Sequence, residues 1–299
     1  MRLSKRLLAS LFSVAAIVLA SCQTAQKSAW EVPAGVKTMA VHGYPIAYVE
    51  HGTGPTVVLV HGSLNDYRYW NPQLESLSSK YRVISLSLRH YYPEPWAGAG
   101  EFSFARHAED LAGFIEGLKS GPVYLVGWSR GGVVAADMAR ARGDLVRKLV
   151  LMDPALDSLV QGAAADEEER IKRIKATEAH FRKGEMETGL QYFFDSGNSP
   201  GAWGRLPEQQ RQNRRDNAWT IVGQLGDVET TTCSDIASFK MPVLLMGGEK
   251  SPARFNRIRA AFQKCLPSAA SVTIPKAAHQ MNQMNPPAFD AALVAFLSS

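Results

Sequence analysis

The feature that most constrains the fold of this chain is a series of short, continuously apolar segments rich in β-branched residues. They lie at 56–60, 82–86, 122–126, 148–152 and 242–246. Such runs are typical of strands buried on both faces of a parallel sheet. Segments with helical periodicity lie between them, at 70–80, 103–119 and 130–141, and residues 41–49 predict a hairpin ahead of them. Strands that alternate with helices predict an α/β fold with a doubly wound, mostly parallel sheet.

The alternation of strands and helices is interrupted in the second half of the chain. From about Ala155 to Ile236 the sequence is charged, has helical spacing at Ile171, Ile174 and Phe181, and contains no strand-like run. An insert between two strands of an open sheet lies over the carboxyl edge, where ligands bind. We therefore predict a helical lid at 155–236 between two parts of one core, 38–154 and 237–299.

The first residues predict an export signal, 1–21. Three basic residues precede the apolar run Leu7–Ala20, which is too short to span a bilayer comfortably. The run ends in Leu-Ala-Ser-Cys22, which resembles the lipobox of bacterial lipoproteins. That resemblance implies lipidation of Cys22, a polar tether at 22–37, and an exported protein anchored by lipid to the periplasmic or cell-surface side of a bacterial membrane. An ordinary secretory signal with a chance cysteine is the alternative.

The charge and cysteine content exclude several kinds of partner. Without the three basic residues of the signal, 30 basic and 28 acidic residues leave a net charge of about +2. This is too little to indicate a nucleic-acid partner. Three cysteines and seven scattered histidines form no metal-binding pattern, so no metal is predicted. After export, Cys233 and Cys265 would form either a disulfide or two buried thiols, and their spacing leaves both open.

The strongest chemical motif is Gly127-Trp128-Ser129-Arg130-Gly131, which follows a predicted strand directly and opens a predicted helix. A serine at such a junction sits on a tight, strained turn that projects its hydroxyl above the sheet. Glycines are needed where the turn packs too closely for Cβ atoms. The amides at the start of the helix also face the point where negative charge develops. We therefore predict Ser129 as a nucleophile.

A second G-x-S-x-G pattern lies at 197–201, around Ser199. It falls inside the predicted lid, in a turn-rich stretch, and Pro200 has no N–H to donate at the residue after the serine. Context therefore favours Ser129 over Ser199.

Two further segments supply partners for this serine. His61-Gly62-Ser63 follows the strand at 56–60, and in a sheet of this kind the loop after that strand supplies one oxyanion donor. We assign the oxyanion hole to the backbone N–H groups of Ser63 and Arg130, and we interpret His61 as structural. His279 follows the last predicted strand, 272–274, and precedes a helix at 287–297, which favours it as the general base.

With these motifs, residues from about Val36 to Ser299 resemble the α/β-hydrolase superfamily, in the lidded branch that includes esterases, epoxide hydrolases, haloalkane dehalogenases and carbon–carbon bond hydrolases. Epoxide hydrolases and dehalogenases of this superfamily use an aspartate where this chain has Ser129. The resemblance thus implies a serine hydrolase that transfers an acyl group to water, most simply by ester hydrolysis, with no cofactor and a small-molecule substrate.

The triad acid is where the sequence departs from the superfamily. After the strand at 242–246 such proteins usually read Gly-Glu-x-Asp, but this chain has Gly248-Glu249-Lys250-Ser251. A serine holds no charge to stabilise the imidazolium. Some relatives carry the acid one strand earlier, where this chain has Asp153. We favour Asp153 as the acid, with Glu249 as the alternative.

The substrate is not specified by the sequence. Trp128 beside the nucleophile and Tyr91, Tyr92 and Trp96 in a loop at the carboxyl edge predict an apolar or aromatic pocket wall. His90 lies in the same loop and is predicted to line the pocket. Two rival functions remain open. One is a non-catalytic lipoprotein of the same fold that binds a small molecule. The other is a cofactor-free haloperoxidase or an acyltransferase that uses the same triad.

Overall fold

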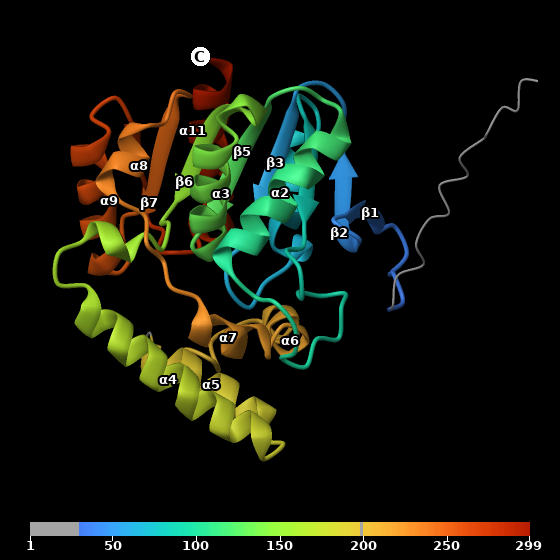
Figure 1. Ribbon diagram of the computed structural model, residues 1–299, viewed down its shortest axis with the longest axis vertical. Helices are drawn as coiled ribbons and strands as arrows, with labels where there is room; N and C mark the ends of the chain where they lie inside the picture. The colour runs from blue at the N-terminus through green and yellow to red at the C-terminus, as the bar shows by residue number, and fades with distance from the viewer. Residues whose placement is uncertain (1–29, 198–199) are drawn as a thin grey trace, which may run out of the picture.

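The computed structural model describes residues 30–197 and 200–299 of the chain, and Figure 1 shows their arrangement. Eight strands form one sheet in the order β1-β2-β4-β3-β5-β6-β7-β8. Their bounds are β1 (Lys37–Val41), β2 (Tyr44–His51), β3 (Thr56–Val60), β4 (Arg82–Leu86), β5 (Val123–Trp128), β6 (Val146–Met152), β7 (Val243–Gly248) and β8 (Ala270–Ile274). β1–β2 and β2–β4 are antiparallel and all other pairs are parallel. The predicted doubly wound, mostly parallel sheet is confirmed.

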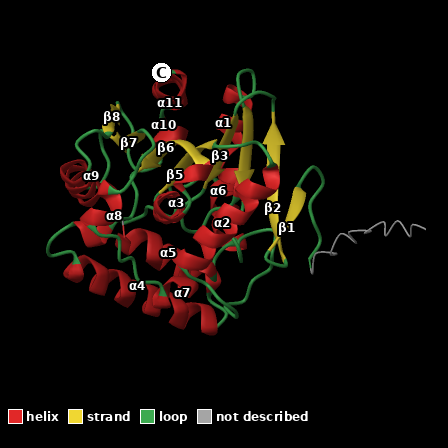
Figure 2. Cartoon of the chain, turned by 45° about the horizontal axis from the view of Figure 1, so that its top comes forward, coloured by secondary structure: helices red, strands yellow, loops and turns green. Residues whose placement is uncertain are grey.

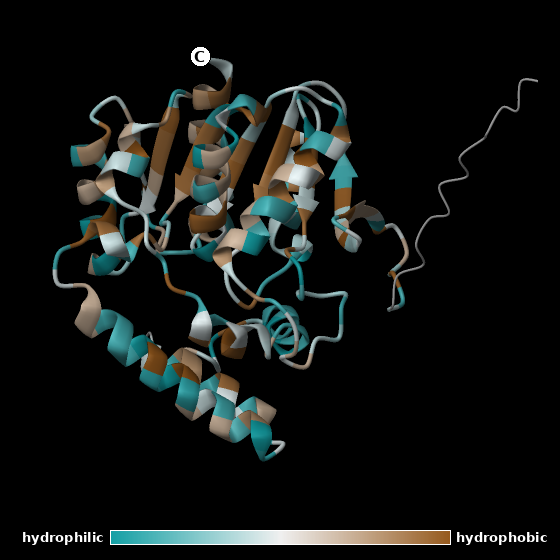
Figure 3. Ribbon diagram, viewed as in Figure 1, coloured by the Kyte–Doolittle hydropathy of each residue, from teal (hydrophilic) through white to brown (hydrophobic). Residues whose placement is uncertain are grey.

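Helices cover both faces of the sheet (Figure 2). One face carries α2 (Phe104–Leu118), α3 (Arg130–Ala141) and α9 (Ala253–Cys265), and the other carries α1 (Asn71–Leu77) and α11 (Pro286–Ser298). Short helices η1 (Tyr67–Trp70), η2 (Gly143–Leu145) and α10 (Met281–Met284) join them. Figure 3 shows that the central strands are hydrophobic along their length. Successive strand side chains point to opposite faces, so Val57 and Val58 enter different apolar clusters.

The register of the sheet brings the carboxyl ends of four strands to one edge. Gly127 pairs with Val60, while Met152 pairs with both Trp128 and Met246. The residues that directly follow β3, β5, β6 and β7 therefore lie side by side at this edge, which is where parallel sheets of this type hold their sites.

In the described part of the segment between β6 and β7, every regular element is a helix. These helices are η3 (Asp157–Leu159), α4 (Ala164–Arg182), α5 (Met186–Gly197), α6 (Glu208–Asp216), α7 (Thr220–Gly223), η4 (Gln224–Gly226) and α8 (Cys233–Ala237). In Figure 1 α4 to α7 form a separate layer at one end of the sheet. This layer has its own apolar cluster, which includes Ile174, Phe181 and Trp203 and reaches the core at Leu64.

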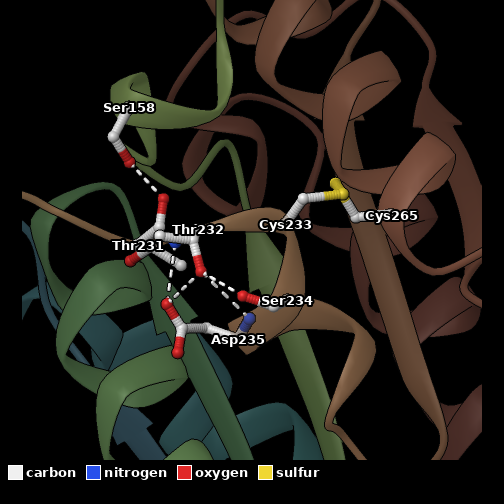
Figure 4. Close-up of a disulfide and its surroundings, with 7 residues drawn as sticks. All are labelled: Ser158, Thr231, Thr232, Cys233, Ser234, Asp235 and Cys265. Carbon is white, nitrogen blue, oxygen red and sulfur yellow. Dashed lines mark hydrogen bonds between the residues drawn. A yellow bond between two sulfur atoms is a disulfide. The ribbon is translucent and has the colours of Figure 1, made fainter.

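The last helix of this segment differs from the others. We expected the lid to run to Ile236, but α8 packs on α9 and is bonded to it through a Cys233–Cys265 disulfide with a Cα–Cα distance of 5.1 Å (Figure 4). Thr232 caps α8, accepting from the N–H of Asp235. Helix α8 therefore belongs with the core. Of the two alternatives for Cys233 and Cys265, a disulfide or two buried thiols, the structure contains the disulfide.

The amino-terminal predictions fall mostly outside the described residues. The signal at 1–21 and Cys22 lie there, whereas residues 30–36 of the predicted tether form turns and irregular chain before β1. No helix of the described part is long and apolar enough to cross a membrane.

Candidate active site

Ser129 occupies the sharp turn between β5 and α3. Its backbone has φ 55° and ψ −120°, a conformation that a residue with a side chain rarely adopts. Its N–H donates to the carbonyl of Met152 at 3.0 Å, and its own carbonyl accepts from Gly132 at 2.9 Å. The turn is thus fixed from both sides. Such a fixed, strained turn is the geometry that exposes a nucleophilic hydroxyl above a sheet.

The glycines around Ser129 are required by close packing. A Cβ on Gly127 would lie 2.5 Å from the carbonyl oxygen of Gly131, and one on Gly131 would lie 2.3 Å from the carbonyl oxygen of His61. Both approaches are closer than carbon and oxygen tolerate, so only glycine fits. The second G-x-S-x-G pattern lacks this setting, because Gly197 ends helix α5 rather than following a strand. Ser199 itself lies outside the described residues.

His279 and Asp153 meet at the same edge of the sheet. Asp153 directly follows β6, its side chain is 2% exposed, and its Oδ2 lies 3.3 Å from Nδ1 of His279. Its N–H donates to the carbonyl of Met246 at 2.9 Å, which fixes the backbone that carries the carboxylate. The carboxylate that reaches the imidazole is therefore the one at the end of β6.

Glu249, the alternative acid, has a different partner. Its Oε2 accepts from the backbone N–H of Lys276 at 2.6 Å, and its own N–H donates to Ile274. The side chain of Glu249 is thus engaged with the turn that leads toward His279, whereas Asp153 faces the ring.

Ser251, at the position where the superfamily usually has its acid, also contacts Asp153. Its Oγ donates to Oδ2 of Asp153 at 2.5 Å and accepts from the N–H of Gly248 at 3.0 Å. The sequence analysis treated Ser251 only as a missing acid. The position of Ser251 in the Gly-Glu-x-Asp motif was the sequence signal that could have placed this residue beside the triad.

The ring of His279 lies between two aromatic side chains. Phe255 from α9 stacks on it at 4.2 Å between ring centroids, and Trp128 lies at 5.0 Å on a tilted plane. The indole Nε1 of Trp128 donates to the carbonyl of His279 at 2.8 Å, and the indole stacks on Tyr69 at 4.2 Å. Trp128 is 3% exposed. The structure thus corrects the prediction that Trp128 lines the pocket, because this side chain packs in the core and holds the histidine loop.

His90 and Tyr91 likewise belong to the scaffold rather than to an open pocket wall. His90 Nδ1 faces Glu94 at 3.0 Å and its ring stacks on Trp96. Tyr91 is 1% exposed and packs its ring edge against His61 at 4.6 Å. Trp128, His90 and Tyr91 are therefore buried in the scaffold, whereas Tyr92 and Trp96, the other aromatic residues of the predicted wall, are partly exposed.

His61 holds the loop that leads to Ser63. Its Nδ1 donates to the carbonyl of Gly62 at 2.8 Å and its Nε2 accepts from the N–H of Leu88 at 3.0 Å. Burial lowers the pKa of His61 to about 4, so the ring is neutral at pH 7. These contacts agree with a structural role. A Cβ on Gly62 would lie 3.0 Å from the Cβ of Ser129, which places the loop directly against the nucleophile turn.

Arg130, whose N–H is a predicted oxyanion donor, has a buried side chain with partners of its own. The guanidinium forms an ion pair with Asp227 at the end of the lid, and its Nη2 lies 3.1 Å from Nδ1 of His107. Burial, reinforced by the charge of Arg130, lowers the pKa of His107 well below its usual value, so this histidine is neutral and able to accept. The residue after the nucleophile thus ties the lid to α3, a role that the sequence analysis missed.

Comparison with known proteins places these features in context. A family model described as the alpha/beta hydrolase fold matches residues 55–283. The 2-(acetamidomethylene)succinate hydrolase of Mesorhizobium japonicum is 27% identical over 250 residues, which cover 79% of this chain and 86% of that protein. The (E)-2-((N-methylformamido)methylene)succinate hydrolase of Acinetobacter baylyi is 25% identical over 257 residues, which cover 84% and 94%.

Solved structures resemble the whole fold. A bromoperoxidase from Bacillus anthracis superposes with a TM-score of 0.72 at 24% identity, covering 88% of this chain and 100% of that one. An esterase from Exiguobacterium antarcticum superposes with a TM-score of 0.70 at 22% identity, covering 89% and 100%. At these identities the structural likeness establishes the fold but not the reaction. The reaction has to be inferred from the residues of the site.

Proposed function

The chain belongs to the α/β-hydrolase fold family, and from this premise we propose that it is a serine hydrolase that cleaves a small carboxylic ester through an acyl-enzyme. The predictions of the superfamily and of an α/β-fold hydrolase are confirmed by the family match and by relatives that are named hydrolases. The observation that carries the proposal is the 3.3 Å approach of Asp153 Oδ2 to His279 Nδ1, beside the strained turn at Ser129.

The first half of the reaction forms the acyl-enzyme. The Oγ of Ser129 attacks the ester carbonyl while Nε2 of His279 takes the hydroxyl proton. Asp153 holds Nδ1–H, which selects the tautomer with a free Nε2 and stabilises the imidazolium as it forms. The N–H groups of Ser63 and Arg130 donate to the oxyanion, and each such donor is worth about 3–4 kcal/mol. The imidazolium then protonates the departing alkoxide, and the C–O bond of the ester breaks.

The second half releases the acid. His279 removes a proton from water, the resulting hydroxide attacks the acyl carbonyl, and the same N–H pair holds the second oxyanion. When this intermediate collapses, the serine oxygen leaves and recovers its proton from His279. The cycle consumes one water and yields one acid and one alcohol.

Turnover of activated esters tests this proposal. Wild-type protein should hydrolyse p-nitrophenyl acetate or butyrate, and Ser129→Ala should remove that turnover while its unfolding midpoint stays close to that of the wild type. Unchanged turnover in Ser129→Ala would contradict the proposal. Product analysis with added alcohol or peroxide distinguishes water from the acceptors that an acyltransferase or haloperoxidase would use.

We further propose that the protein is exported and lipid-anchored through Cys22. The basic and apolar leader with its Leu-Ala-Ser-Cys ending supports this, and the Cys233–Cys265 disulfide suits an oxidising compartment. Intact-mass analysis of protein from the native membrane should find cleavage before Cys22 and added acyl mass. An unmodified protein cut at another residue would contradict the anchor.

A further inference from the structure

The lid contains a buried arginine without a charged partner. Arg214 in α6 is 2% exposed. Its Nη1 donates to the carbonyl of Gln210 in the same helix at 3.0 Å, and its Nε is buried without a hydrogen-bond partner in the described part of the chain. Burial lowers the pKa of Arg214 to about 10, and the nearby groups Tyr69 and Asp66 offset this only in part. An unpaired buried charge is strongly unfavourable, so its presence requires an explanation.

Asp66, whose charge acts on Arg214, and Asp216 of the same helix are committed to other groups. Asp66 accepts from Arg68 at 2.6 and 2.8 Å and from the side-chain amide of Asn217 at 2.6 Å. Asp216 pairs with Arg68 at 2.8 Å. The neighbouring arginines of α6 differ from Arg214 in having acidic partners, Glu208 for Arg211 and Glu187 for Arg215. Among the described residues, the Nε of Arg211 is also buried without a hydrogen-bond partner, so the feature that distinguishes Arg214 in this helix is the lack of an acidic partner for its charge.

The position of Arg214 relates it to the triad. The Asn217–Asp66 and Asp216–Arg68 contacts seat α6 on the loop that continues from Ser63. Tyr69 directly follows Arg68 in the short helix η1, at the end of this loop. Its hydroxyl donates to Oδ1 of Asn282 at 2.6 Å, three residues after His279, and its ring stacks on Trp128 beside the nucleophile.

The electrostatics of Tyr69 agree with this placement. Burial raises the pKa of Tyr69 well above its usual value. The positive charge of Arg214 opposes that rise, and the negative charge of Asp153 adds to it. The hydroxyl of Tyr69 is therefore within electrostatic reach of both the lid arginine and the proposed triad acid.

We propose that Arg214 binds a carboxylate of the substrate, so that the ester cleaved here carries a free acid group at the far end of its acyl chain. This inference rests on the proposed ester hydrolysis and names its substrate class. A guanidinium presents Nε–H and Nη–H in a planar fork that matches a carboxylate, and Nε is the unpartnered donor of Arg214. Binding the anion supplies the missing counter-charge and holds the remote end of the acyl chain.

Two matched esters test this inference. Mono-p-nitrophenyl glutarate and p-nitrophenyl pentanoate have the same reacting group and acyl length, but only the first carries a carboxylate. Arg214→Met should lower kcat/KM for the glutarate ester by about 10- to 100-fold, the scale of a hydrogen bond to a charged group. It should change kcat/KM for the pentanoate ester by less than about twofold. Arg211→Met, on the same helix, is the control and should not separate the two esters.

Equal losses on the two esters, or no loss on either, would overturn the carboxylate site. If wild-type protein hydrolyses neither ester, the proposed hydrolysis is wrong. The carboxylate site is then tested by measuring ligand binding, without any turnover. Calorimetric titration with glutarate should show binding to the wild type, weakened at least tenfold in Arg214→Met, while pentanamide should not distinguish the two proteins. Equal glutarate affinities, or no glutarate binding to the wild type, would overturn the inference.

The stability of Arg214→Met separates this role from a structural one. Replacing an unpaired buried cation by an apolar side chain of similar length should leave the unfolding midpoint unchanged or raise it. A lower midpoint together with loss of both activities would mean that Arg214 supports the lid, and would contradict the carboxylate site.

Discussion

The hydroxyl of Ser251 donates a 2.5 Å hydrogen bond to Oδ2 of Asp153, the same oxygen that lies 3.3 Å from Nδ1 of His279. Ser251 occupies the position after β7 where the superfamily usually has its acid, and Asp153 follows the neighbouring strand, β6. The two positions are therefore adjacent in space. An acid supplied from either strand end reaches the same region. The charge can therefore come from the end of β6, while the position after β7 carries a serine that donates to it.

The assignment of the acid predicts unequal effects for two conservative changes. Asp153→Asn should lower kcat by about 10⁴-fold, the scale seen when an orienting carboxylate is neutralised. Glu249→Gln should change kcat only slightly, because Glu249 contacts the N–H of Lys276 rather than the imidazole. Steady-state kinetics on one activated ester measure both variants. A larger loss in Glu249→Gln would show that Glu249, which follows β7, is the acid.

The contact between Ser251 and Asp153 predicts that a carboxylate at position 251, after β7, can replace the carboxylate of Asp153. Ser251→Ala alone should lower kcat by about tenfold or less, because it removes a contact that positions Asp153 but leaves the carboxylate itself beside His279. Adding Ser251→Asp to Asp153→Asn should recover at least about tenfold of the lost kcat, since a carboxylate returns to the same region. The double variant is compared with Asp153→Asn in one assay. No recovery in a folded double variant would contradict the equivalence of the two positions.

Asp137 in α3 predicts a pH dependence of stability. Burial raises the pKa of Asp137 to about 6 from an ordinary 3.8, and nearby carboxylates including Glu229 add to this rise. A raised carboxyl pKa contributes stability that is present at low pH and is lost as the pH rises through about 6. Asp137→Asn should therefore be more stable than the wild type at pH 8, by about 1–3 kcal/mol, with the difference shrinking toward pH 4. Urea unfolding at both values measures it, and a variant less stable at pH 8 would contradict it.

The disulfide predicts a loss of stability on reduction. Cys233 and Cys265 are 32 residues apart, and closing a loop of this length stabilises a fold by about 3–4 kcal/mol. A Cys233→Ser, Cys265→Ser double variant should lose about that free energy of unfolding. A thiol reductant should lower the wild-type unfolding midpoint and leave that of the variant unchanged. Wild-type stability that is insensitive to the reductant would contradict a bonded pair.

The sequence predicted those parts of the molecule that local pattern determines. The buried strands, the junction at Ser129 and the place of His279 after the last strand follow from runs of neighbouring residues, and strand adjacency brought Asp153 to the same edge. The contacts of Arg130 with Asp227, and of Ser251 with Asp153, join residues about 100 positions apart and leave no local pattern. Trp128 was assigned to the pocket because its neighbour is the nucleophile, but alternation along β5 turns its side chain into the core.

The most direct test of this account is to identify the residue that a serine-directed fluorophosphonate modifies. Peptide mass mapping of labelled wild-type protein should place the adduct on Ser129, because His279 activates that hydroxyl. Ser129→Ala should take up no label, Ser199→Ala should label at the wild-type rate, and His279→Ala should label far more slowly. An adduct on Ser199, or a folded wild-type protein that takes up no label, would contradict the assignment of Ser129 as nucleophile.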